Sequence, residues 1–92
     1  MKVIVLPQAE ESLKRSIHEL SAFYELRYLE RSVRRLGGNP GAGQFEPELA
    51  WMNMGHRRVI VRNFKIVYRI NDDLVVVNDI FDSRRDPGRM KG

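Results

Sequence analysis

The order of apolar and polar residues predicts that the chain begins with a short strand followed by a helix. Lys2–Leu6 is an apolar run of strand length. Pro7 follows it, and proline is favoured in the first turn of a helix. Apolar residues then recur at three- and four-residue spacing, which predicts one apolar helix face. These residues are Ala9, Leu13, Ile17 and Leu20.

A second helix is predicted to start near Ser21, because serine is a good N-terminal cap. It is predicted to end at Gly37–Gly38, and residues 39–41 form a turn beyond it. Its apolar face consists of Ala22, Leu26, Leu29, Val33 and Leu36, with Phe23 beside it. Because the two helices are close in sequence, we expect an antiparallel helical hairpin.

After a loop at residues 38–48 the periodicity changes to two, which predicts strands. The predicted strands are Leu49–Met54, Arg57–Asn63, Phe64–Ile70 and Leu74–Phe81, with tight turns at Arg62–Asn63 and Asn71–Asp73. The polar tail from Asp82 is expected to fray. The order β-α-α-β-β-β predicts one α+β domain over residues 1–92. It would contain an N-terminal strand, the helical hairpin and a three- to four-stranded antiparallel sheet.

Alternation along the predicted strands divides the side chains between two faces of the sheet. One face would carry Phe64, Ile66, Tyr68 and Ile70, and the other Lys65, Val67 and Arg69. In the preceding strand, Arg58, Ile60 and Arg62 share one parity, and Arg57, Val59 and Val61 share the other. Helices that cover one face would leave the other face bearing cations. The pattern therefore predicts a groove for a negatively charged ligand.

The charge distribution supports this interpretation, because the net charge of +4 comes entirely from the second half. Residues 1–50 hold seven basic and seven acidic residues, whereas residues 51–92 hold nine basic and five acidic ones. A basic region of this kind suits a phosphate backbone or an acidic protein. The charges on the outer helix faces are interpreted as a solvated surface. They are Lys14, Arg15, Arg27, Glu30, Arg31, Arg34 and Arg35.

The residue inventory predicts neither a cofactor nor a metal ion. The chain has no cysteine, which fits a reducing cytoplasm and excludes a thiolate metal site. His18 and His56 are far apart and do not have a metal-ligand spacing. No glycine-rich phosphate-binding motif is present. The apolar N-terminal run is too short for a signal peptide or a membrane span, so we expect a cytoplasmic protein without a membrane partner.

A few single residues carry specific expectations. His18 is interpreted as structural, whereas His56 opens the basic strand and could donate to a phosphate or transfer a proton. Asp79 lies in an apolar strand and is expected to form an ion pair with Arg58, Arg62 or Lys65. Trp51 and Met52 are interpreted as packing residues.

The second half of the chain resembles the sheet signature of the RelE/ParE toxin superfamily. Residues 55–70 read GHRRVIVRNFKIVYRI, with the glycine–x–arginine entry and the aromatic–basic–aliphatic–aliphatic–tyrosine run of that signature. Residues 73–77 and 80–87 are similar to its last strand and basic ending. The helical hairpin and Asn39–Pro40–x–x–Gly43 fit its N-terminal half. The resemblance covers nearly the whole chain.

The resemblance implies the toxin of a type II toxin–antitoxin module, neutralised by a cognate antitoxin protein. The ParE branch of the superfamily poisons DNA gyrase, and the RelE branch cleaves messenger RNA on the ribosome. The chain lacks the C-terminal tyrosine or histidine of many RelE-type enzymes, and its Arg-Arg-Asp-Pro ending is closer to ParE. We therefore expect a gyrase inhibitor, as a dimer or a toxin–antitoxin hetero-oligomer. An mRNA endoribonuclease and a non-toxic nucleic-acid-binding or interaction module remain as alternatives.

The resemblance also selects candidate site residues. For an RNase, the implied catalytic residues are Arg58, Lys65 and Arg84. For target or antitoxin binding, the candidates are Arg57, Arg58, Arg62, Lys65, Arg69, Arg84 and Arg85.

Overall fold

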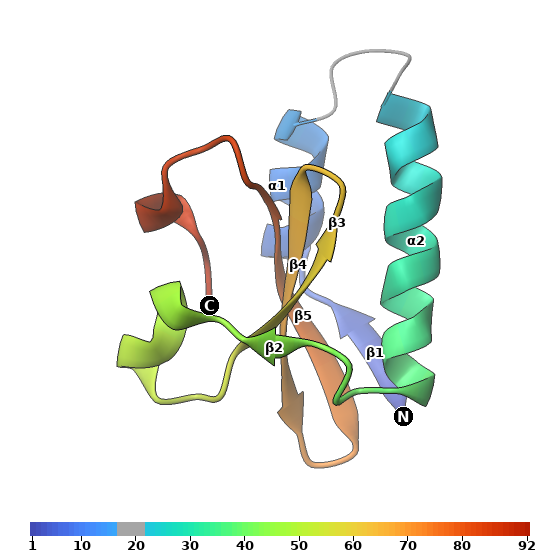
Figure 1. Ribbon diagram of the computed structural model, residues 1–92. Coiled ribbons are helices and arrows are strands. Elements are labelled where there is room, and N and C mark those ends of the chain that lie inside the picture. The colour runs from blue at the N-terminus through green and yellow to red at the C-terminus, as the bar shows by residue number, and fades with distance from the viewer. Residues whose placement is uncertain (17–21) are drawn as a thin grey trace.

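A computed structural model describes residues 1–16 and 22–92, and the side chains of all of these except residues 22–25. It contains two α-helices, two short 3₁₀ helices and a sheet among the described residues (Figure 1). The helices are α1 (Pro7–Ser16), α2 (Ala22–Gly38), η1 (Pro47–Met52) and η2 (Pro87–Arg89). The strands are β1 (Lys2–Val5), β2 (Gln44–Phe45), β3 (Arg57–Val61), β4 (Phe64–Asn71) and β5 (Leu74–Asp82).

The strands form one sheet in the order β1-β5-β4-β3-β2. Strands β2 to β5 are antiparallel, and β1 joins the edge parallel to β5 with Lys2 opposite Leu74. The tight turns are confirmed, because Arg62 and Asp72 both have a positive φ. The structure confirms the predicted α+β class and its β-α-α-β-β-β order.

The main core lies between the sheet and the two α-helices, which run in opposite directions as predicted (Figure 1). Its buried residues are Ala9, Leu29, Leu36, Phe64, Ile66, Tyr68, Val75, Val77 and Ile80. Full burial of a large apolar side chain stabilises the fold by roughly 1.5–3 kcal/mol. The apolar helix faces are thus confirmed wherever they are described. Some of the predicted residues lie outside the described part of the chain. They are Ile17, His18, Leu20 and the Ser21 cap, together with the side chains of Ala22 and Phe23.

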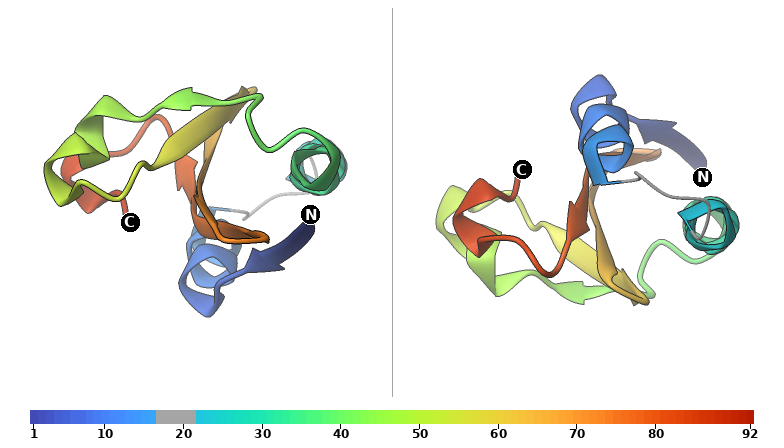
Figure 2. Two further views of the ribbon diagram at one scale, coloured as in Figure 1. Left: turned by 90° about the horizontal axis from the view of Figure 1, so that it is seen from below. Right: turned by 90° about the horizontal axis from the view of Figure 1, so that it is seen from above.

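The opposite face of the sheet, called the second face below, is covered by η1 and the tail (Figure 2). The predicted strand at residues 49–54 is wrong, because residues 47–52 form a 3₁₀ helix. Glu46 caps this helix by accepting a hydrogen bond from the Glu48 N–H, and Pro47 occupies its first turn. Asn53 ends it in the left-handed conformation. This local capping outweighs the alternating pattern.

The tail is ordered, so the expected fraying is wrong. The Asp86 side chain accepts the Gly88 N–H and caps η2. Met90 is 8% exposed and joins a second buried cluster with Leu49, Val67 and Phe81. The backbone N–H of Lys91 donates to Asp79 Oδ2 at 2.9 Å. One apolar anchor and one buried hydrogen bond therefore hold a polar segment on the second face.

Candidate functional site

Lys65 lies on the second face, as its strand parity predicted, and its charge is matched by a buried carboxylate. Its Nζ lies 3.0 Å from Oε1 of Glu46, which is 1% exposed. The other oxygen of Glu46 accepts the Glu48 N–H at the start of η1. Removing one partner of a buried ion pair leaves an uncompensated charge and is strongly destabilising. Lys65 therefore fixes η1 to the sheet.

Arg57 and Arg58 hold β2 and the preceding loop against β3. Arg57 donates from Nη1 to the carbonyl oxygen of Gly43 at 2.7 Å, and its guanidinium lies 4.2 Å from the centroid of the Phe45 ring. Arg58 donates from Nη1 to the carbonyl oxygen of Phe45. Both guanidinium groups thus bind backbone carbonyls of the same chain.

Tyr68, on the helical face of the sheet, also anchors the loop at residues 38–48. Its hydroxyl donates to the carbonyl oxygen of Pro40 at 2.6 Å and accepts the N–H of Gly43 at 2.9 Å. Gly43 is so close that an added Cβ would lie 2.7 Å from both the Tyr68 hydroxyl and the Arg58 carbonyl oxygen. Only glycine fits there, because interiors are close-packed.

His56 is buried at 3% exposure, and neither ring nitrogen has a hydrogen-bond partner among the described residues. Gly92 of the tail packs against its ring. Burial lowers the pKa of His56, and the charge of Arg69 lowers it further. A buried, neutral imidazole does not favour the predicted contact of His56 with a phosphate.

Arg84 follows β5 and binds the carboxylate of Asp82 through two hydrogen bonds. Its Nε and Nη2 lie 2.9 and 2.8 Å from the two oxygens. The hydrogen bond from Arg84 lowers the pKa of Asp82 and outweighs the opposing effect of burial. Arg85 donates to the carbonyl oxygen of Arg15 in α1 at 3.5 Å. The basic ending therefore connects β5 to α1.

The open cationic groove expected on the second face is not found, because η1 and the tail occupy it. The predicted ion pair of Asp79 is also wrong. Lys65 pairs with Glu46 instead, and Asp79 accepts the Lys91 N–H while its Oδ1 has no partner among the described residues. Trp51 is 75% exposed, against its predicted packing role, whereas Met52 does pack on the second cluster.

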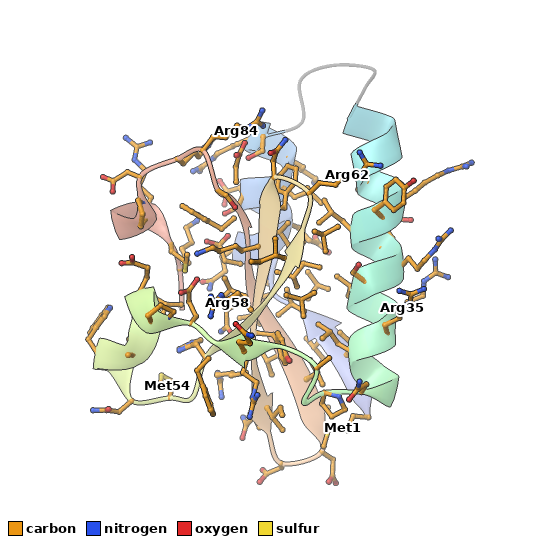
Figure 3. All side chains as sticks on the ribbon, in the orientation of Figure 1. Met1, Arg35, Met54, Arg58, Arg62 and Arg84 are labelled. Carbon is orange, nitrogen blue, oxygen red and sulfur yellow. The ribbon has the colours of Figure 1, made fainter. Side chains whose placement is uncertain are left out.

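The predicted cations do not converge on one site. Figure 3 shows Arg58 near the middle of the sheet, whereas Arg62 and Arg84 lie toward the end where β3 turns into β4. Arg62 is exposed, and its guanidinium lies 4.3 Å from the centroid of the Tyr28 ring on α2. Glu46 was not predicted as a site residue. The sequence signal that could have found it is the Glu46–Pro47 cap at the start of η1.

The first face has an apolar groove of about 470 Å³ between α1 and α2, with the sheet as its floor. Its apolar lining consists of Val5, Leu13, Leu26, Leu29, Val33 and Ile80. Charged residues of both signs, Glu10, Lys14, Glu30 and Arg34, border it. The sequence predicted these apolar residues as helix core but gave no sign that the helices stand apart.

Residues 3–87 match the family described as the ParE toxin of the type II toxin–antitoxin system parDE. The chain belongs to this family. The match confirms the resemblance and its closeness to the ParE branch, and it includes both α-helices and all five strands except the first residue of β1. No curated protein matches the chain significantly.

Membership of the ParE family implies an antitoxin partner for this toxin. In this ParE toxin, Lys65 and Arg58 on the second face bind groups of their own chain, and the apolar groove lies on the helical side. No helix among residues 1–16 and 22–92 is long and apolar enough to cross a membrane.

Proposed function

We propose that this ParE-family chain inhibits DNA gyrase by binding it, and that a cognate antitoxin neutralises it. The observation that carries the proposal is the engagement of all three candidate nuclease residues within the fold. Lys65 binds buried Glu46, Arg84 binds Asp82, and Arg58 binds a backbone carbonyl. An RNase would need cations directed at a scissile phosphate. The arrangement supports a binding mechanism over a catalytic one.

We propose that the target contacts the predicted site residues that lie away from the part of the second face under η1 and the tail. These residues are Arg62, Arg84 and Arg85. Arg62 is exposed, and the side chain of Arg84 keeps 62% of its surface accessible while it pairs with Asp82. The other predicted site residues would act indirectly, by holding the sheet, η1 and the loop at residues 38–48 in shape. They are Arg57, Arg58, Lys65 and Arg69.

The proposal is tested by adding the purified toxin to gyrase with plasmid DNA and, separately, to translating ribosomes. We expect gyrase activity to be poisoned, with cleaved plasmid accumulating and messenger RNA remaining intact. Addition of the cognate antitoxin should restore supercoiling. Codon-phased cleavage of the message with unaffected gyrase would instead establish the RelE-like endoribonuclease. Inactivity in both assays would favour the non-toxic interaction module.

We place the antitoxin in the groove between α1 and α2. A groove of this size with an apolar floor suits the apolar face of an amphipathic helix, and the mixed charges at its border suit flanking polar residues. Leu13 and Leu26 are only half-buried in the free toxin, so a partner would gain by covering them.

The double variant Leu13→Ala/Leu26→Ala is expected to weaken antitoxin binding by roughly 10–100-fold, because truncating central apolar anchors commonly costs about 1 kcal/mol or more each. Binding would be measured by isothermal titration calorimetry, with thermal unfolding as the test of folding. Arg31→Ala, on the opposite face of α2, is the control and should bind normally. A folded double variant with unchanged affinity would show that the antitoxin does not bind in this groove.

A further inference from the structure

The outer face of α2 carries a row of four arginines, for which the sequence pattern predicted only a solvated surface. They are Arg27, Arg31, Arg34 and Arg35, and all four are exposed. At 3.6 residues per turn they lie on the side of the helix opposite buried Leu29 and Leu36, with Arg34 also bordering the groove between the helices. Figure 3 shows Arg35 pointing away from the sheet.

These arginines differ from the cations of the second face, because no ion pair among the described side chains involves them. The described ion pairs join Arg15 to Glu11, Lys65 to Glu46 and Arg84 to Asp82. Glu30 lies toward the groove between the helices. No described carboxylate therefore forms an ion pair with the arginine row, and Glu30 is the described carboxylate beside it on α2.

Arg62 extends the arginine row from α2 to the turn between β3 and β4. Its guanidinium lies 4.3 Å from the centroid of the Tyr28 ring, and Tyr28 is 43% exposed on α2. A cation held over an aromatic ring loses less freedom when it binds a partner than a free side chain does. The turn thus adds an oriented fifth cation to this side of the molecule.

We propose that this arginine row binds the phosphate backbone of duplex DNA. From Arg27 to Arg35 the helix rises about 12 Å, and over that length of its axis a DNA duplex carries roughly seven phosphate charges on its two strands. Guanidinium groups are forked donors suited to phosphate oxygens. Hydrogen bonds to phosphate oxygens carry no sequence information, so the proposed contact with the backbone is independent of DNA sequence.

The same face is less suited to a protein partner. A protein interface needs a desolvated apolar or aromatic centre, and among the described side chains of α2 the exposed aromatic residue, Tyr28, is already stacked with Arg62. The apolar surface described above lies instead in the groove on the other side of the helix. The inference deepens the proposed function, because gyrase acts on DNA and the arginine row would hold the toxin on the enzyme–DNA complex.

The experiment measures binding of the full chain to a fluorescently labelled 20-base-pair duplex, without gyrase, by anisotropy at 50 to 200 mM NaCl. With four phosphate contacts, the logarithm of the association constant should fall with the logarithm of the salt concentration with a slope of about −3.6. This slope corresponds to a roughly 150-fold weakening of binding between 50 and 200 mM NaCl. The variant Arg31→Ala/Arg35→Ala should show a slope of about −1.8, a roughly tenfold weakening. The variant Arg31→Lys/Arg35→Lys keeps the charge and should retain most of the slope.

The matched control, Arg89→Ala/Lys91→Ala, removes two cations of the tail, away from α2, and should leave the slope unchanged. The inference is overturned if the wild-type chain does not bind the duplex at 50 mM salt. It is also overturned if the salt dependence of binding decreases equally in both double alanine variants. It is also overturned if Arg31→Ala/Arg35→Ala loses antitoxin affinity while DNA binding is unchanged. DNA binding through the row without gyrase inhibition would reject the proposed function and retain this inference.

Discussion

Replacing Gly43 with alanine is expected to lower the free energy of unfolding by roughly 2–4 kcal/mol, combining overpacking with the loss of a buried hydrogen bond. The new Cβ would lie 2.7 Å from the backbone oxygen of Arg58 and 2.7 Å from the hydroxyl of Tyr68. Neither atom can move easily, because Arg58 belongs to β3 and the Tyr68 hydroxyl is bound to Pro40. Urea denaturation measures the change.

Gly41→Ala is the control for this prediction. Gly41 lies in the same loop, and nothing is within 4 Å of the position of its added Cβ. Its free energy of unfolding should change by less than about 1 kcal/mol. In a Tyr68→Phe background the Gly43→Ala penalty should shrink, because one of the two clashing oxygens is gone. Equal losses for Gly41→Ala and Gly43→Ala would show that the contact around Gly43 is not tight.

Replacing Met90 with aspartate is expected to detach the tail and lower the free energy of unfolding by about 2–3 kcal/mol. Met90 is the tail residue in the second cluster, and a buried carboxylate without a partner is not tolerated there. The Lys91 amide, which donates to Asp79 in the intact fold, should lose its protection from hydrogen exchange. Hydrogen exchange and urea denaturation together check the prediction.

Ser83→Asp is the matched control for the tail, because it adds the same charge at an exposed position of the same segment. It should leave both the Lys91 amide and the unfolding free energy nearly unchanged. If Met90→Asp behaves like Ser83→Asp, the tail contributes nothing to stability and does not cover the second face in solution.

The sheet could be predicted because its signals are local. Alternation along residues 57–70 and the polar turn at residues 71–73 define β3, β4 and the start of β5 without tertiary information. The segment at residues 47–52 could not be predicted from alternation. Its backbone is set by the Glu46 side chain and Pro47, and the same carboxylate also binds Lys65, 19 residues away.

The candidate site was less predictable, because its charges depend on pairings between distant residues. Parity placed Lys65 on the second face correctly, yet it could not show that Glu46 would meet it there. Likewise, polar composition indicated a frayed tail, but Met90 and the Lys91 N–H are sufficient to hold it. An apolar helix face also looks the same in sequence whether its helix packs on another helix or borders a groove.

The parallel pairing of β1 with β5 has a consequence for how the toxin forms. Lys2 lies opposite Leu74, so the two ends of this contact are 72 positions apart in the sequence. Contacts of such separation form late and slow the folding of a chain. During synthesis, β1 has no strand to pair with until β5 has left the ribosome. The sheet of the toxin is thus completed only after the last strand, β5, has been synthesised and is free to pair with β1.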